Sequence, residues 1–364
     1  TGEAVLAGTL SSPRARISAA GRALQFQSLQ AADLDLDFEL TARDRLTARL
    51  LATGLMNNDL ALGELQLQAA GSSALHTLSA KLAGGAADIE FTATGGWDGS
   101  VLSEQFTTAS IRQPDLGEWR LEDTTRLRIS ADSASLEAHC WMQQSASLCV
   151  GDTRGSAAAF DSSFELRDFP LTPVAPLLPP GLSVSGVANA SATLRSDATG
   201  WRGKLRWRQR DTLLTYLLND GATFTSTIES LDVAIDSAAA GATLLASVRG
   251  DQGLVLNATA QLAAPLDADS ALVSEIKGEV ADISVLRPWL LEVVDVGSME
   301  GLLSLDLQVA GTPRQPVFSG GIYLREGLLQ LPDAGITLAD INVRAASVGS
   351  NTLNLDGGFR SGKG

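Results

Sequence analysis

The chain contains few of the residues that catalytic and metal sites require. Its 364 residues include two histidines and two cysteines, whereas a zinc site needs about four ligands. Neither His76 nor His139 has further candidate ligands nearby, and both are expected to be structural, with His76 on the polar face of a strand. No G-x-S-x-G, P-loop or dinucleotide-binding pattern occurs, and the S-x-x-K match at 274–277 lacks its companion motifs. The sequence therefore predicts no catalytic residues, no metal, no cofactor and no enzymatic activity.

The chain also lacks positive net charge and long hydrophobic runs. Its formal net charge is −15 and its pI about 4.6, which argues against nucleic-acid binding and against adsorption onto anionic lipid headgroups. No window reaches the ~18 uninterrupted apolar residues that a spanning helix needs, because prolines and charges interrupt the stretches 174–182 and 285–294. The chain starts at Thr1 with no targeting segment after it, so we expect a fragment of a longer protein.

Aromatic residues are scarce as well. They make up 5% of the chain and there are three methionines, so the 45% hydrophobic content is mainly Leu, Ala, Val and Ile. A prior of ~150 residues per domain suggests two or three domains, but it assumes compact globules. Aliphatic side chains of medium size suit the lining of a long surface.

Apolar and polar residues alternate with period two along much of the chain, which is typical of strands with one buried and one solvated face. The clearest stretch is 33–40, where four acids alternate with four apolar residues; others are 65–67, 231–235, 254–257, 303–309 and 353–356. Clusters of turn-forming residues at 95–99, 219–221 and 357–358 indicate hairpins. With one strand and turn every ~12 residues, these patterns predict an antiparallel meander of about 30 strands.

Helix is expected only as short turns, in 171–180 and 283–294, because prolines limit both segments. These two segments begin a repeat. An offset of 115 residues aligns Gly186 with Gly301 and also relates 171 to 286, 173 to 288 and 194 to 309, and an offset of 114 relates 221 to 335 and 224 to 338. We therefore predict one continuous β-repeat fragment over 1–364, with repeat units at about 166–280 and 281–364, the second truncated.

A sheet of this kind needs something against its apolar face. The choices are a second sheet, closure into a barrel, or a trough whose lining faces a guest. Alternating leucines are also typical of an ordinary sandwich core. The aliphatic lining, the absence of a closing signal and the regular polar face favour the trough: an all-β, elongated, curled antiparallel sheet with a hydrophobic groove and very little helix.

The two cysteines, Cys140 and Cys149, are separated by eight residues with turn formers among them. A hairpin there would bring the two Cα atoms within the ~4.4–6.8 Å that a disulfide requires. The sequence predicts either this disulfide, typical of an oxidising compartment, or two buried thiols.

Several ordered motifs resemble the TamB family, which lies within the AsmA-like group of bridge-like lipid transfer proteins. The C-terminal part of that family tends to carry a Gly-Thr, Pro, Gly, strand, Gly, strand progression, and the resemblance covers nearly the whole chain. The residues that carry it are His76 and Leu78, Gly95-Gly96-Trp97, Gly117-Glu118-Trp119, Leu121, Cys140 and Cys149, Phe169-Pro170-Leu171, Gly311-Thr312, Pro316, 320–324, 327–332, 335–341, 353–357 and Ser361-Gly362.

The resemblance implies a periplasmic protein tethered to the inner membrane by an N-terminal segment that this chain does not include. It implies a U-shaped sheet with a hydrophobic groove, called a β-taco, and an outer-membrane partner, a TamA-type barrel, contacted through segments outside this chain. Movement of phospholipid between the membranes and support of outer-membrane protein folding are the roles inferred for the family.

We therefore expect phospholipid acyl chains to lie along the apolar face. The candidate lining residues are Leu34, Leu36, Phe38, Leu40, Leu303, Leu305, Leu307, Val309, Ile322 and Leu324. The alternative is a chaperone or scaffold that holds outer-membrane β-strands without carrying lipid. A third possibility, a secreted adhesin or passenger-type solenoid, predicts a dry, packed interior.

Overall fold

The computed structural model describes residues 1–9, 12–41, 44–217, 221, 223–264, 267–286, 296–348 and 352–362. It confirms the predicted fold class, because the described chain is nearly all β and its 25 strands belong to one antiparallel sheet. The chain divides into two compact units, Thr1–Phe164 and Glu165–Gly364, which we describe separately.

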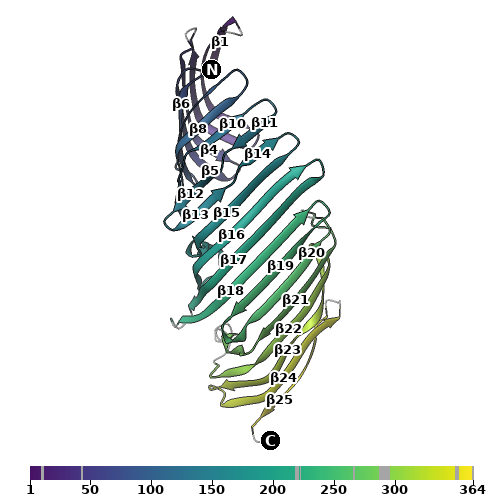
Figure 1. The fold of residues 1–364 in the computed structure, drawn as a ribbon. Helices are drawn as coiled ribbons and strands as arrows, with labels where there is room; N and C mark the ends of the chain where they lie inside the picture. Colours follow the sequence, from purple (N-terminus) through teal and green to yellow (C-terminus); the bar gives the residue numbers. More distant parts are fainter. Residues whose placement is uncertain are drawn as a thin grey trace. The chain divides into compact units, whose positions relative to one another are not determined.

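Unit 1 is a curled sheet of short and medium strands (Figure 1). From β1 to β8 each strand pairs with the next one along the chain. The strands are β1 (Gly2–Thr9), β2 (Ser12–Phe26), β3 (Leu29–Leu40), β4 (Leu46–Asn57), β5 (Leu60–Gly71), β6 (His76–Ala83), β7 (Asp88–Trp97), β8 (Leu102–Gln113), β9 (Gly117–Leu121), β10 (Thr125–Ile129), β11 (Ser133–Leu136), β12 (His139–Gln143), β13 (Ala146–Val150), β14 (Thr153–Ser156) and the start of β15 (Phe160–Pro170).

The pairing in unit 1 departs from a simple meander at β8. One end of β8 pairs with β9, and the other end pairs with β10. From there two ladders continue, β9–β12–β13 and β10–β11–β14. The short strands β9–β14 therefore share one long strand as their starting edge.

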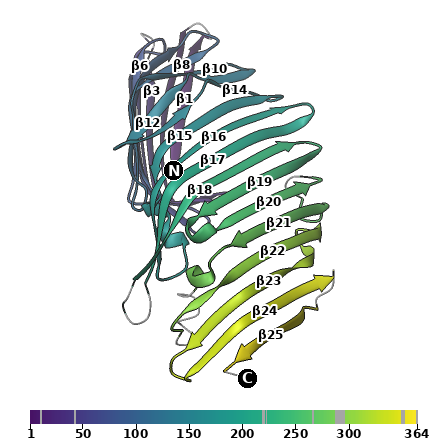
Figure 2. The same cartoon turned by 60° about the horizontal axis from the view of Figure 1, so that its bottom comes forward.

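Unit 2 contains the longest strands, which lie side by side in a single layer (Figure 2). From β16 to β25 each strand pairs with the next. The elements are η1 (Thr172–Leu177), β16 (Leu182–Asp197), β17 (Gly200–Leu217), β18 (Thr223–Ala238), β19 (Gly241–Gly250), η2 (Asp251–Gly253), β20 (Val255–Leu262), β21 (Leu272–Val280), η3 (Ile283–Leu286), β22 (Met299–Thr312), β23 (Gln315–Leu331), β24 (Ile336–Val348) and β25 (Asn354–Ser361).

The register places apolar side chains of successive strands on one face, because directly opposed residues of an antiparallel pair point to the same side. In unit 2, Val280, Leu303, Leu324 and Val343 form one such row across four strands. In unit 1, an equivalent row consists of Leu34, Ala52, Leu65, Leu82 and Ile89. We call this side of each unit its apolar face and the other side its polar face.

Little of the apolar face is fully buried. The chain exposes 22185 Å², whereas a compact monomer of this mass exposes about 14,000 Å². Some of the buried hydrophobic residues form three small clusters, centred on Leu55 in unit 1 and on Leu171 and Met299 in unit 2, and others, such as Ala93 and Val309, lie outside them. A thick sandwich core is therefore not what stabilises these sheets.

Where the structure describes them, the two expected helical segments contain 3₁₀ turns. η1 lies within the predicted segment 171–180 and contains Pro176, and η3 begins the second segment at Ile283. The rest of that second segment, 287–294, lies outside the described residues. Both turns precede a long strand whose pairing is interrupted by a bulge, at Gly186 in β16 and at Gly301 in β22.

Two expected turns are placed differently. Gly95 and Gly96 belong to β7, and the turn follows at Asp98, whose carboxylate accepts hydrogen bonds from the N–H groups of Ser100 and Val101. Residues 357–358 lie inside β25 rather than in a turn, and residues 219 and 220 lie outside the described part of the chain. None of the helical segments described is long and apolar enough to cross a membrane.

Candidate functional site

Six of the ten candidate lining residues lie together on the apolar face of unit 2. On β22 and β23, Leu303 is opposite Leu324 and Leu305 is opposite Ile322. Leu307 and Val309 continue the same face of β22, where Val309 is buried and the other leucines are half-buried. Ile322 is 42% exposed, so the face is accessible at this point.

The remaining four candidates lie together on the apolar face of unit 1. Leu34, Leu36, Phe38 and Leu40 are half-buried along β3, while the intervening acids are exposed. Their partners on β2 are small or aliphatic, for example Ala19 opposite Leu36. The alternation seen in the sequence thus corresponds to the two faces of one strand.

In unit 2, part of the apolar face is covered locally by the 3₁₀ turns. Leu171, Val174 and Leu178, in and beside η1, pack with Val184 and Ala188 of β16. Beside η3, Ile283 and Val296 pack with Met299 of β22. The repeat offset of 115 relates Val184 to Met299 and Ala188 to Leu303, so both turns cover equivalent positions of the sheet.

Further along the same strands, the apolar face carries large side chains in contact with solvent. Leu194 on β16, Phe318 on β23 and Leu355 on β25 are all exposed, and Phe318 is 50% exposed. Exposed apolar area of this extent usually marks a binding surface. An apolar guest would therefore find contacts beyond the 3₁₀ turns.

The apolar face of unit 1 includes a pair of polar side chains, His76 and Glu104. The sequence pattern had wrongly placed His76 on the polar face. His76 is opposite Gly71 of β5 and Gly95 of β7, and Gly95 is opposite Glu104 of β8. His76 Nε2 and Glu104 Oε1 are 2.7 Å apart, with side-chain exposures of 11% and 6%. His76 was expected on the polar face because Leu75 precedes it, but Leu75 lies in the turn before β6 and is 69% exposed.

The contacts of His76 fix how its ring nitrogens are used. Nδ1 lies 3.2 Å from the carbonyl oxygen of Ser72, which can only accept, so Nδ1 carries a proton. Nε2 faces Oε1 of the Glu104 carboxylate. The other carboxylate oxygen, Oε2, is buried without a hydrogen-bond partner among the described residues. Glycine at position 95 leaves room for this carboxylate, since a Cβ there would lie 2.6 Å from Oε2.

The cysteines form the predicted disulfide. Cys140 and Cys149 are directly opposite each other in the β12–β13 hairpin, and their Cα atoms are 4.0 Å apart, closer than the expected range. The second histidine, His139, is buried next to this bond and donates from Nδ1 to the carbonyl oxygen of Glu137 at 2.9 Å. Its contacts here are those of a structural residue.

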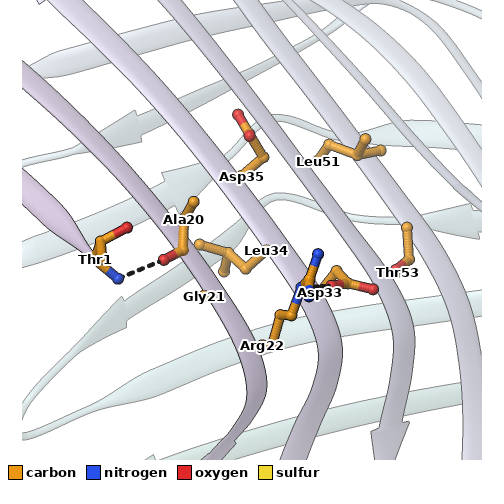
Figure 3. Close-up of a pocket in the computed structure, with 9 residues that line it drawn as sticks. All are labelled: Thr1, Ala20, Gly21, Arg22, Asp33, Leu34, Asp35, Leu51 and Thr53. Carbon is orange, nitrogen blue, oxygen red and sulfur yellow. Dashed lines mark hydrogen bonds and ion pairs between the residues drawn. The ribbon is translucent and has the colours of Figure 1, made fainter.

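The cavities described in unit 1 are bordered mainly by residues of the polar face, although Leu34, Leu36 and Phe38 of the candidate lining each border one of them. One of about 440 Å³ is bordered by Arg22, Asp33, Asp35, Leu51 and Thr53, which share the polar face by their register. Figure 3 shows these side chains and the ion pair between Arg22 and Asp33. Charged, solvated walls of this kind do not suit an acyl chain, whereas the half-buried side chains of the candidate lining on β3 and β22 offer an aliphatic surface.

The sequence reading missed a row of cations on the polar face of unit 2. Alternate residues of β17 are Arg202, Lys204, Arg206, Arg208 and Arg210. Lys204 and Arg206 both contact Asp236 of β18, at 3.4 and 2.9 Å, and Arg208 and Arg210 both contact Asp232, at 3.9 and 3.0 Å. The hydrogen bond from Arg206 lowers the pKa of Asp236 below its ordinary value of 3.8. The period-two spacing of these cations was visible in the sequence.

No cluster of three or more potential metal ligands occurs among the described residues. The paired acids of β3 are exposed and spread along the strand.

A family model described as TamB, N-terminal domain, matches residues 1–324. The match leaves out the last of the motifs that suggested this family, those at 327–362. TamB proteins are transport and assembly components of the cell envelope and are not a known enzyme family. Because the match covers most of the chain and the chain folds as a large antiparallel sheet with one apolar face, this protein belongs to the TamB family.

Proposed function

We propose that the apolar faces of both units carry phospholipid acyl chains, so that the chain serves as a periplasmic segment of a bridge between the inner and outer membranes. One observation carries the proposal. Ordered rows of aliphatic side chains run from strand to strand on one face of each unit, yet most remain only half-buried.

Burial of acyl chains on this face is favourable because each CH₂ removed from water contributes ~0.8 kcal/mol. A polar headgroup keeps its hydration if it projects past the rim of the sheet. Since the candidate lining is mainly aliphatic, a lipid can exchange one set of aliphatic contacts for the next without a large barrier. Such movement needs no catalytic residue.

The family and the disulfide both support a location in the periplasm for this proposed function. Bonds such as Cys140–Cys149 persist in oxidising compartments, among them the bacterial periplasm. Tethering to the inner membrane and pairing with an outer-membrane TamA-type barrel belong to the same proposal, through segments outside this chain. Support of outer-membrane biogenesis would follow from the supply of lipid.

The direct test is lipid extraction and mass spectrometry of the purified chain and of a Leu305→Arg variant. We expect phospholipid to co-purify with the wild type and to be lost from the variant, because a charge on the lining cannot be solvated by an acyl chain. Leu324→Asp, on the facing strand, should have the same effect.

The matched control is Ser304→Arg, which adds the same charge one residue away on the polar face. It should retain bound lipid. Lipid-free wild type that is folded and stable would contradict the proposal. Crosslinks to nascent outer-membrane proteins, without recovered lipid, would instead favour the chaperone or scaffold function, which would use the same exposed apolar side chains.

A further inference from the structure

The cation row on β17 forms a long positive strip on the polar face of unit 2. Its members are spaced two residues apart, or about 6.8 Å in an extended strand, so Lys204 and Arg210 are about 20 Å apart. The four side chains from Lys204 to Arg210 are 40–71% exposed. They are therefore accessible to a partner.

The acids around the row do not neutralise it. Asp232 and Asp236 are each shared by two cations, and Asp197 contacts Arg202. By register, the polar face of β16–β19 also includes Arg249, which makes six cations against three carboxylates. Two further acids, Asp211 and Glu229, lie at bulges near one end of the row, so the strip is positive even when both are counted.

The fold itself does not require these cations. The repeat offset of 115 relates β17 to β23, which follows an equivalent bulged strand. There, the positions related to Arg202, Lys204, Arg206 and Arg208 are Val317, Ser319, Gly321 and Tyr323, and only the position related to Arg210 keeps a cation, Arg325. The same strand pairing thus forms without the charges, which points to a role outside the sheet.

Several side chains that face the cation row from the neighbouring strands are short. Lys204, Arg206 and Arg208 are opposite Thr193, Ser191 and Asn189 of β16, and Ala234 of β18 lies opposite Arg206. Long cations above a floor of small residues present charge without shaped pockets. Such a surface suits a fluid layer of anions better than a folded protein partner, which needs shape complementarity.

We propose that this strip, the polar face of β17 with Arg249, docks onto the headgroup layer of an anionic phospholipid membrane. The net charge of −15 does not prevent this, because charges act over a Debye length of about 10 Å at moderate ionic strength and the strip is longer than that. The expectation drawn from net charge alone, that the chain avoids anionic headgroups, therefore does not apply to this face.

The test is co-sedimentation of the whole chain with vesicles of phosphatidylcholine, alone or mixed with phosphatidylglycerol. We expect binding to the anionic vesicles only, weakened by salt. In the double variant Arg206→Gln/Arg208→Gln, Lys204 and Arg210 still pair with the two aspartates. Since each cation near an anionic bilayer strengthens binding about fivefold, the double variant should bind about 25-fold more weakly.

The matched control is Arg325→Gln/Arg344→Gln, which removes two cations from the polar face of β23 and β24. It should bind as the wild type does, with all variants folded by circular dichroism. Equal loss in both double variants, equal binding to both kinds of vesicle, or no binding to either would overturn the proposal. The last result would leave an acidic protein as the remaining partner for the row. Because the apolar lining is unchanged in these variants, the outcome is independent of the lipid-extraction test.

Discussion

The two units stabilise the same kind of sheet by different means. Unit 1 has a disulfide between neighbouring strands and a nearly buried ion pair, His76–Glu104, on its apolar face. Unit 2 has neither among its described residues; instead, 3₁₀ turns cover apolar clusters at equivalent positions of a repeat, each followed by a bulge at a glycine. The apolar face is common to both units, whereas the devices that stabilise it are local.

This difference shows which kinds of site stabilise a single-layer sheet. With little core, each unit depends on a few sites where burial is high, and these sites are where substitutions should matter most. Residues on the polar face of unit 2 vary between repeat copies without a change in strand pairing, as β17 and β23 show.

The largest effect is expected at the ion pair of unit 1. His76→Leu leaves Glu104 buried without its partner, and loss of one member of a buried pair costs about 3–5 kcal/mol. The free energy of unfolding of unit 1, measured by urea denaturation, should fall by this amount.

The double variant His76→Leu/Glu104→Leu is the control, because it removes both polar partners together. It should recover most of the lost stability. If the single and double variants were equally destabilised, the ion pair would not be what makes this site sensitive, and the contrast between the units would weaken.

A smaller effect is expected at the bulges of unit 2. Gly186 and Gly301 have φ values of 139° and 140°, which L-residues rarely adopt, so an alanine at either should cost roughly 1–3 kcal/mol. A Cβ would also lie 3.0 Å from Thr212 Oγ1 at position 186, and 3.0 Å from the Cα of Gly327 at position 301. Thermal unfolding should show similar losses for the two variants.

Gly221→Ala provides a comparison, because φ is also positive there but no atom of the described residues lies within 4 Å of the added Cβ. Its cost should be smaller than at either bulge. Clearly different losses of stability at positions 186 and 301 would contradict the structural equivalence of the two repeat units.

The smallest effect concerns the polar face of unit 2. The pKa of Asp236 is lowered chiefly by the hydrogen bond from Arg206, so Arg206→Gln should raise this pKa toward 3.8. Because the folded-state pKa is depressed, the contribution of Asp236 to stability is present above its unfolded pKa and is lost as the pH falls through the folded value. A carboxyl titration followed by NMR measures the change, and an unaltered pKa in the variant would show that the contact is not made in solution.

Much of the fold was predictable from the sequence because period-two alternation maps directly onto the faces of a strand. Residues 33–40 and 303–309 are strands with the predicted faces. The hairpin at Cys140–Cys149 followed from spacing. The branching at β8 was not predictable, because it depends on one long strand pairing with two short ones, and no local pattern specifies such a choice.

The misplacement of His76 shows where face assignment from sequence fails. Counting back from Leu78, Ala80 and Leu82 places His76 on their face, as the structure does, but counting from Leu75 gives the opposite result because Leu75 belongs to the turn. Glu104, 28 residues away, had no sequence signal linking it to His76. The positions 357–358 were read as a turn because glycines form turns more often than strands.

The most direct test of lipid carriage is photo-crosslinking along β22, with a photoreactive amino acid placed singly at each position from 303 to 308 in cells. Phospholipid should be captured at Leu303, Leu305 and Leu307, on the apolar face, and not at Ser304, Asp306 or Gln308, on the polar face. This period-two pattern is what binding of acyl chains to one face of the sheet predicts. Capture at every position, or at none in a folded protein, would contradict it.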